Sequence, residues 1–326
     1  MKKIICTFML LQALAAYSQK EGNIWYFGVN AGLDFNSGTP VALLDGELTS
    51  DEGTAAMADA QGNLLFYTNG MTVWNKNHQI MENGTGLEGM ITSAQSALIV
   101  PEPGFGNTYY IFTVQYQAQG GLTYSEVDMD ANNGLGRITA AKNVLLVPIT
   151  TEQLTGVMHT NGNDVWVTTH GYPNNTFYSF LVTTQGVTTT PVTSNQGLVF
   201  TDESDTMGCM KISPDGTKIA TANELSGAQL FDFDAATGIV SNSLQLTGQR
   251  PLYGVSFSPS GKVLYFTDIG DGGLLQYNLQ ANNIPASQLI FTDGAFSSNW
   301  GMQLAPDGKI YFVSPGDGLA AINNPD

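Results

Sequence analysis

The residue types that do most protein chemistry are scarce in this chain of 326 residues, which has three histidines and two cysteines. His159 and His170 flank a predicted turn at residues 161–163, with His159 beside the turn and His170 about six residues along the following strand. At a strand rise of ~3.3 Å per residue, the two rings are roughly 20 Å apart. Ligands of one metal ion must approach closely, so this pair predicts no metal site. His78 falls in another predicted turn, at the outer rim of the fold.

Two acidic segments have the composition of calcium loops without the spacing. In the segment that starts at Asp128, the twelfth position is Thr139 rather than Glu, and the glycine falls one place late. Residues 268–273 (Asp-Ile-Gly-Asp-Gly-Gly) are interpreted as another solvated turn. No metal or other cofactor is expected, and bound calcium remains only an alternative.

Nucleophilic catalysis is not predicted either. No serine lies in a nucleophile elbow or has a histidine at a workable spacing. Cys209, in the expected strand 207–212, is interpreted as a small core residue rather than a reactive thiol. We therefore expect no catalytic residues.

The elements that would position any binding residues are repeated hairpins. The clearest copies are residues 212–219, 257–266 and 304–313; weaker copies are residues 57–67, 98–112 and 157–167. The turn glycines Gly216, Gly261 and Gly308 are 45 and 47 residues apart. Proline presets the second position of a type I turn, and glycine accepts the left-handed conformation that closes the hairpin. A hairpin period of about 40–50 residues is typical of a propeller blade.

We therefore predict an all-β, seven-bladed propeller of four-stranded antiparallel blades, of the WD40-like or YVTN-like kind. Without residues 1–18 the chain has 308 residues, or 44 for each of seven blades, within the usual blade length of roughly 40–45 residues. Residues 19–326 then form one propeller domain. The expected blades cover residues 23–44, 54–90, 93–148, 154–197, 207–246 and 253–291, and the seventh starts at residue 299.

The two ends of the domain are predicted to be incomplete. Strands 23–28, 32–35 and 40–44 form a first blade without its innermost strand, and few residues follow Gly308. We expect the C-terminus to stop before the ring closes, which leaves unpaired edges on the first and last blades. In an alternative, residues 24–29 pair as the outer strand of the seventh blade.

Residues 1–18 have the pattern of a signal peptide. Lys2 and Lys3 precede an apolar stretch at residues 4–16, which is too short to span a membrane. Its removal takes the net charge from −17 to −19, which disfavours binding to nucleic acid and anionic lipid. Only Cys209 remains, so no internal disulfide forms. We expect a secreted or cell-surface protein, and the alternative is a buried N-terminal helix.

The mouth of the central channel is the predicted binding surface, because the loops between blades and the turns between second and third strands gather there. Residues that enter the innermost strands, with one residue from a turn between strands, are the candidate binding residues: Glu52, Gln95, His170, Arg250, Tyr253 and Trp300. Arg250 is one of nine basic residues that remain after residue 18. The alternative for each residue is a capping or packing role.

Several segments resemble the propeller region of exported proteins of gliding bacteria that carry a gliding-motility-associated C-terminal domain for type IX secretion. The matching segments are residues 23–28 (Asn-Ile-Trp-Tyr-Phe-Gly), 62–75, 81–89, 109–113 and 322–326. The resemblance covers most of the mature chain, and no such sorting domain follows Asp326. It implies the N-terminal part of a larger secreted or cell-surface protein, and it implies no molecular activity.

The function expected from these observations is a non-catalytic binding or interaction module. Its partner would be a protein or glycan at the cell surface, and the domain would be monomeric. One alternative is a lactonase-like or other hydrolytic propeller, which requires calcium or an acid–base cluster at the mouth. Another is a structural adhesin or spacer, whose mouth would hold no concentration of polar side chains.

Overall fold

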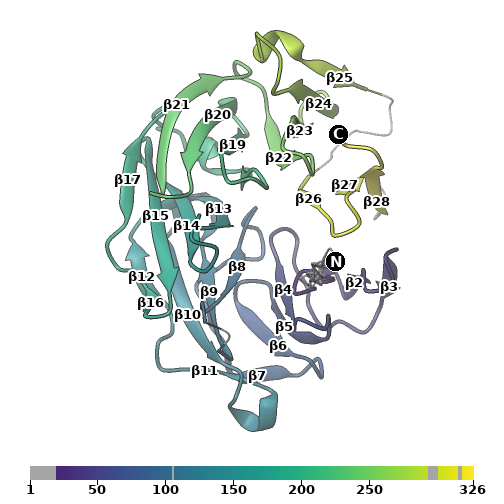
Figure 1. Ribbon diagram of the computed structural model, residues 1–326, viewed down its shortest axis with the longest axis vertical. Helices are drawn as coiled ribbons and strands as arrows, with labels where there is room; N and C mark the ends of the chain where they lie inside the picture. Colours follow the sequence, from purple (N-terminus) through teal and green to yellow (C-terminus); the bar gives the residue numbers. More distant parts are fainter. Residues whose placement is uncertain (1–19, 105, 293–299, 315–317) are drawn as a thin grey trace, which may run out of the picture.

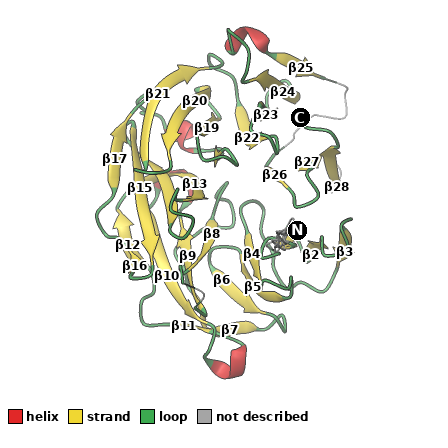
Figure 2. Ribbon diagram, viewed as in Figure 1, coloured by secondary structure: helices red, strands yellow, loops and turns green. Residues whose placement is uncertain are grey.

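The computed structural model describes residues 20–104, 106–292, 300–314 and 318–326. The expected signal peptide at residues 1–18 lies outside the described residues. The described chain is all-β, with four short 3-10 turns as its helical elements. Small antiparallel sheets are arranged side by side around a common centre, as in a propeller (Figures 1 and 2).

Five of the sheets are separate units, and a sixth sheet is larger. The first contains β1 (Ile24–Phe27), β2 (Ala31–Asp34) and β3 (Val41–Leu43). The large sheet contains β4 (Ala55–Ala58), β5 (Leu64–Thr68), β6 (Thr72–Asn75), β7 (Ile80–Thr85), β8 (Ala97–Pro101), β9 (Thr108–Thr113), β10 (Leu122–Asp128), β11 (Arg137–Ile138) and β12 (Val144–Val147). The next contains β13 (Thr150–Met158), β14 (Val165–Gly171), β15 (Thr176–Thr183), β16 (Gly186–Val187) and β17 (Val192–Asn195).

Three further sheets follow in chain order. They contain β18 (Met210–Ile212), β19 (Lys218–Asn223), β20 (Gly227–Asp234) and β21 (Ile239–Gln245); β22 (Leu252–Phe257), β23 (Val263–Asp268), β24 (Gly273–Asn278) and β25 (Leu289–Phe291); and β26 (Met302–Leu304), β27 (Ile310–Ser314) and β28 (Gly318–Ile322). The short helical elements are η1 (Tyr116–Ala118), η2 (Asn132–Gly134), η3 (Glu203–Thr206) and η4 (Pro285–Ser287).

The expectation of seven separate four-stranded blades is therefore corrected to five separate sheets and one of nine strands. The nine-stranded sheet arises because β11 pairs in parallel with β7 through Arg137 and Glu82. Strand number also varies, because long β10 pairs on one side with both β11 and β12. Two of the separate sheets keep four strands, β18–β21 and β22–β25.

The first and last sheets have three strands each, as the sequence predicts. β1 pairs with β2 in a register that places Ile24 opposite Asp34, so the alternative that joins residues 24–29 to the last blade is wrong. The ring of Tyr311 on β27 has its centroid 6.1 Å from that of Trp25 and 5.9 Å from that of Phe35. The two end sheets thus meet through aromatic rings.

The repeated turns have the predicted conformation. Gly216, Gly261 and Gly308 have φ angles of +71°, +70° and +80°, in the left-handed region that glycine adopts without strain. Each glycine N–H donates to the carbonyl three residues earlier, at 2.9, 2.9 and 3.0 Å. The same short turn therefore joins the first two strands of three sheets.

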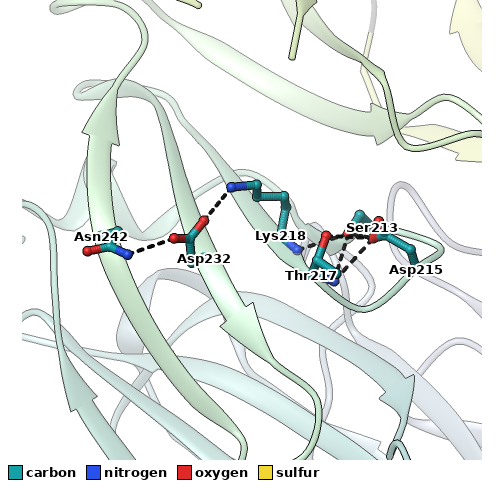
Figure 3. A network of polar contacts seen from close by, with 6 residues as sticks. All are labelled: Ser213, Asp215, Thr217, Lys218, Asp232 and Asn242. Carbon is teal, nitrogen blue, oxygen red and sulfur yellow. Dashed lines mark hydrogen bonds and ion pairs between the residues drawn. The ribbon is translucent and has the colours of Figure 1, made fainter. Parts of the chain in front are cut away.

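Figure 3 shows the first of these turns and its connection to the sheet. Asp215 Oδ1 accepts hydrogen bonds from Ser213 Oγ (2.6 Å), Thr217 N (3.1 Å) and Thr217 Oγ1 (2.9 Å). Lys218, the first residue of β19, donates to Asp232 of β20. Partial burial raises the pKa of Asp215, but the bonds from Ser213 and Thr217 outweigh it, so the pKa is lowered.

Apolar side chains fill the spaces between neighbouring sheets, so the core is divided into layers. Phe66 of β5 and Ile111 of β9 belong to one layer. Ala220 of β19 and Leu252 of β22 belong to another. This packing aligns the first strands of the sheets around the centre and gathers the loops between sheets at one face.

Candidate binding site

The mouth, as we use the term, is the face where the loops between sheets meet the loops that follow β9 and β19. Three glutamates from three of these segments form what we call the glutamate cluster: Glu52, Glu152 and Glu224. Glu52 precedes β4, Glu152 is the third residue of β13, and Glu224 directly follows β19. The cluster is electrostatically coupled, because Glu52 and Glu152 are both affected by the charge of Glu224 and Glu152 also by that of Glu52.

Glu152 is the deepest member of the cluster and is fully buried. Its Oε2 accepts a hydrogen bond from Ala94 N at 2.7 Å, and its Oε1 accepts one from Gln117 N at 3.0 Å. Burial raises the pKa of Glu152 to about 8, with smaller contributions from Glu52 and Glu224, while the two amide donors oppose the rise. The Glu152 carboxyl is therefore largely protonated at neutral pH.

Glu52 is half-buried and only partly satisfied. Its backbone N donates to Ile91 O at 3.0 Å, but its Oε2 is buried and, within the described ranges, has no hydrogen-bond partner. Burial raises the pKa of Glu52 to about 7; the nearby Tyr253 hydroxyl opposes the rise, and the charges of Asp51 and Glu224 add to it. Its carboxyl is thus close to half-protonated at neutral pH.

Tyr253 faces the cluster from the first residues of β22. Its side chain is 3% exposed, and its hydroxyl has no hydrogen-bond partner in the described part of the chain. The hydroxyl lies near the Glu52 carboxyl and each group shifts the pKa of the other, but they do not close a hydrogen bond of ordinary geometry. Burial raises the pKa of Tyr253 far above its usual value, and the charges of Cys209, Glu52 and Glu152 add to it.

Two further aromatic side chains surround the cluster. Tyr116 lies in η1. Its pKa is raised by desolvation and by the charges of all three glutamates of the cluster. Trp300 is 40% exposed and packs edge-on against Tyr253, with ring centroids 4.9 Å apart. The mouth therefore combines carboxyl groups with aromatic rings.

Gln95 and Arg250 were predicted from the sequence to bind a ligand. In the structure, their side chains form hydrogen bonds within the protein. Gln95 uses its amide to bind the backbone of Met210 and Leu154. Arg250 Nε donates to the fully buried carboxylate of Asp268 at 2.6 Å. Asp268 Oδ1 also accepts from two backbone amides of the following turn, so that acidic segment is occupied by its own chain.

The expectation that His170 lines an open mouth is corrected by its burial. The ring is 2% exposed and packs against Phe177 and Phe200, with centroids 4.7 and 4.6 Å away. Its Nδ1 lies 2.9 Å from Gly171 O. Burial lowers the pKa of His170 to about 4, so it is a neutral core residue.

Glu152, Glu224 and Tyr116 were not predicted from the sequence. Glu152 stands two residues before the expected start of a blade, as Glu52 does, so the same offset identifies it. Glu224 lies in the loop between β19 and β20, and Tyr116 in the loop between β9 and β10. Of the loops of this kind, only the one after His170 supplied a candidate from the sequence. Whether Glu224 and Tyr116 lie near the other mouth residues depends on the path of each loop in space, which the sequence does not specify.

Within the described ranges, no group of three His, Cys, Asp or Glu side chains is arranged to hold a metal ion. Cys209 is buried beside the mouth, and burial raises the pKa of its thiol to about 12, so it is not a reactive thiolate. Among the same residues, no helix is long and apolar enough to cross a membrane.

A second, outer hollow of about 440 Å³ lies between the first sheet and β4–β7. His78 lies on its wall, with Nδ1 3.1 Å from the Tyr67 hydroxyl and Nε2 3.5 Å from Asp45 Oδ2. Asp45 also accepts from the Tyr26 hydroxyl at 2.9 Å. His78 thus lies at the outer rim, as expected, and its ring nitrogens already have partners.

No protein-family model matches the chain, and no curated protein matches it. A solved structure of a protein from Lactobacillus plantarum shares 15% identity with it over 89% of this chain and 86% of that one, with a TM-score of 0.50. A candidate 6-phosphogluconolactonase from Bacteroides uniformis shares 16% identity over 79% and 74%, with a TM-score of 0.47. Hydrazine synthase of Kuenenia stuttgartiensis shares 11% identity over 96% and 99%, with a TM-score of 0.49. At these identities the likeness concerns the fold alone and carries no information on ligand or reaction.

Proposed function

We propose that this protein is a non-catalytic binding module whose ligand enters the mouth. The observation that carries the proposal is the polar chemistry there: Glu52 Oε2 and the Tyr253 hydroxyl are both buried without hydrogen-bond partners among the residues that the structure describes. Buried polar groups in folded proteins almost always have partners, so a site that leaves several unsatisfied is suited to a ligand that supplies them. The partner class that we propose is a protein or glycan at the cell surface.

A binding screen with a matched pair of variants tests this function. Glycans and candidate surface proteins are tested for binding to the wild type, to Glu52→Gln at the mouth, and to Glu82→Gln on outer strand β7. We expect binding that Glu52→Gln weakens and Glu82→Gln leaves unchanged. A ligand whose affinity responds equally to both variants binds elsewhere and contradicts the assignment.

We also propose that the nine-stranded sheet is two propeller blades joined at their outer edges, which gives seven blades in all. The strands β4–β7 and β8–β12 fall in two expected blade segments, and the link between them is the single Arg137–Glu82 pair. A crystal structure with seven radial sheets supports this interpretation. A structure in which β4–β12 form one continuous flat sheet contradicts it.

Export to the cell surface is proposed from the sequence. The signal-peptide pattern at residues 1–18 and the resemblance to propellers of gliding bacteria support a secreted or surface location, in the N-terminal part of a larger protein. We propose that the domain is monomeric. Cell fractionation and the molar mass in solution test these two points, and a cytosolic protein or a stable dimer contradicts them.

A hydrolytic function, of the lactonase-like kind, is the second candidate. It is favoured by the pKa values of about 7 for Glu52 and about 8 for Glu152, because carboxyls that titrate near neutral pH act as general acids and bases. A panel of lactones and glycosides tests it. Turnover that Glu52→Gln abolishes and Glu82→Gln preserves would replace the binding proposal with an enzymatic one.

A further inference from the structure

The glutamate cluster has no cationic partner in the described part of the chain. None of the ion pairs formed there includes Glu52, Glu152 or Glu224. Two basic groups have partners outside the cluster: Arg250 pairs with Asp268, and Lys211 Nζ donates to Gln303 Oε1 at 2.7 Å. The three carboxyls, whose charges influence one another, thus have no compensating positive charge among the described residues.

Three acceptor atoms, one in the cluster and two in residues next to it in the chain, also lack donors. Glu52 Oε2, Gln153 Oε1 and Asn223 Oδ1 are buried without hydrogen-bond partners among the described residues. Gln153 is next to Glu152 in the chain, and Asn223 is next to Glu224. Gln153 Oε1 and Asn223 Oδ1 only accept hydrogen bonds, and Glu52 Oε2 only accepts when its carboxyl is ionised, so a donor is the partner that each of them lacks.

Aromatic rings complete the surroundings. Tyr253 and Trp300 pack edge to face, with an interplanar angle of 82°, and Tyr116 is in the electrostatic field of the three carboxyls. Aromatic faces attract organic cations, and tyrosine and tryptophan are among the strongest such groups. The side chains around the cluster therefore suit a positive charge carried on an apolar stem.

We propose that the mouth binds an alkylammonium group, supplied either by a lysine side chain or by a free aliphatic amine. An ammonium group presents three N–H donors and no acceptor, which matches the unpartnered Glu52 Oε2 in its ionised form, and its charge is opposite to that of ionised glutamates. Calcium is the poorer match because it takes six to eight oxygen ligands, whereas no group of three acidic, histidine or cysteine side chains is arranged for a metal among the described residues. The inference rests on the proposed binding function and names its ligand class.

Binding of the ammonium group displaces protons from the cluster. In the free protein the pKa values of Glu52 and Glu152 are about 7 and about 8, so Glu52 is close to half-protonated and Glu152 largely protonated at neutral pH. A cation stabilises the ionised carboxylates, which lowers their pKa values and releases protons to solvent. The affinity therefore rises from about pH 6 to about pH 9, below the pKa of ~10.4 of the amine itself.

Calorimetry with matched ligands tests the inference on the whole chain. The ligands are lysine blocked at both ends, cadaverine, and blocked norleucine, which has an apolar side chain without the charge. We expect blocked lysine or cadaverine to bind, norleucine not to bind, and the heat to change with the ionisation enthalpy of the buffer as protons are released. Which of the two amines binds more tightly identifies the source of the ammonium group.

Variants locate the site. Glu52→Gln and Glu224→Gln are each expected to weaken amine binding at least about tenfold, because each removes a charged partner, whereas Glu82→Gln is expected to leave it unchanged. Glu152→Gln is avoided because both of its oxygens accept backbone amides. Tyr253→Phe is a second mouth variant that preserves shape, and the circular dichroism of each variant confirms folding.

The possible results distinguish the proposed ammonium site from the more general proposal that the mouth binds a ligand. Equal binding of norleucine, or equal losses in Glu52→Gln and Glu82→Gln, overturns the ammonium site. So does calcium binding at the mouth that amines do not displace. A neutral glycan that binds the wild type and not Glu52→Gln preserves the proposed function but overturns this inference, and the absence of any mouth ligand overturns both.

Discussion

Gln95 holds the backbone of Met210 with both ends of its side-chain amide, although the two residues are 115 positions apart in the chain. Its Oε1 accepts from Met210 N at 2.7 Å, and its Nε2 donates to Met210 O at 3.0 Å. The same Oε1 accepts from Leu154 N at 3.1 Å. One amide, in the loop before β8, therefore connects the first strands of two further sheets, β13 and β18.

Replacement of Gln95 by alanine should destabilise the fold. Gln95→Ala removes the hydrogen-bond partners of Met210 N, Met210 O and Leu154 N, so we expect the free energy of unfolding to fall by about 2–4 kcal/mol. Urea unfolding measures the change. Gln280→Ala, at an exposed side chain without hydrogen bonds, is the control and should change stability by less than ~0.5 kcal/mol. Equal effects of the two variants would mean that the Gln95 amide contributes nothing.

Two buried tyrosines should respond oppositely to loss of the hydroxyl group. Tyr253 has an unpartnered hydroxyl, so Tyr253→Phe is expected to leave stability unchanged or to raise it by up to ~1 kcal/mol. The Tyr265 hydroxyl donates to Pro325 O at 2.9 Å, and Tyr265→Phe should cost about 1 kcal/mol. Thermal unfolding of the two variants measures the contrast. A loss for Tyr253→Phe as large as that for Tyr265→Phe would show that the Tyr253 hydroxyl has a partner.

The pH dependence of stability should change when Glu52 loses its charge. Its pKa is raised in the folded protein from 4.5 to about 7, so the folded state holds a proton that the unfolded state has lost between these pH values. The contribution of Glu52 to stability therefore falls as the pH rises through this window. The melting temperature of Glu52→Gln, relative to the wild type, should rise from pH 5 to pH 8.

Glu82→Gln provides the control for this comparison. Comparison of variant and wild type at each pH cancels the contribution of His170, whose lowered pKa has the opposite effect as the pH rises from about 4 to 6.5. The difference between Glu82→Gln and the wild type should stay constant with pH. A constant difference for Glu52→Gln as well would show that the Glu52 carboxyl titrates normally.

The carboxylate of Asp215 should matter for the turn in Figure 3. Asp215→Ala removes an acceptor that serves Ser213 and Thr217, and we expect a loss of about 1–2 kcal/mol in the free energy of unfolding. Because the pKa of Asp215 is lowered in the folded state, its stabilising effect is present above the usual aspartate pKa and disappears in more acidic solution. Denaturant titrations at pH 7 and pH 3 measure this, and an unchanged midpoint at pH 7 would contradict it.

Local turn chemistry made much of the fold predictable. The Pro-Asp-Gly and Pro-Ser-Gly turns fix their hairpins independently of the rest of the chain, because their glycines need positive φ. Strand groups consequently start and end close to the expected boundaries. The link between Glu82 and Arg137 could not be predicted, because it depends on where the loop after β10 folds in space.

Residues of the candidate site could be predicted only where their distance in sequence from the first strand of a sheet determines where they lie in space. Glu52 and Tyr253 come together as neighbours of the mouth, since both enter first strands. His170 was misplaced because the end of a second strand is buried under Phe177 and Phe200 rather than open. Glu224 was missed because the direction of a loop side chain depends on tertiary contacts.

The contact of Tyr311 with Trp25 and Phe35 determines where the molecule should open first. In the described chain no backbone hydrogen bonds between strands join the first sheet to the last. Packing of aromatic rings connects them at this junction instead. Amide protons of β1 and β27 should consequently exchange with deuterium sooner than those of β14 or β19, whose sheets have neighbours on both sides. The junction between the first and last sheets is then the part of the ring that unfolds locally, and that proteases cleave, before any other part.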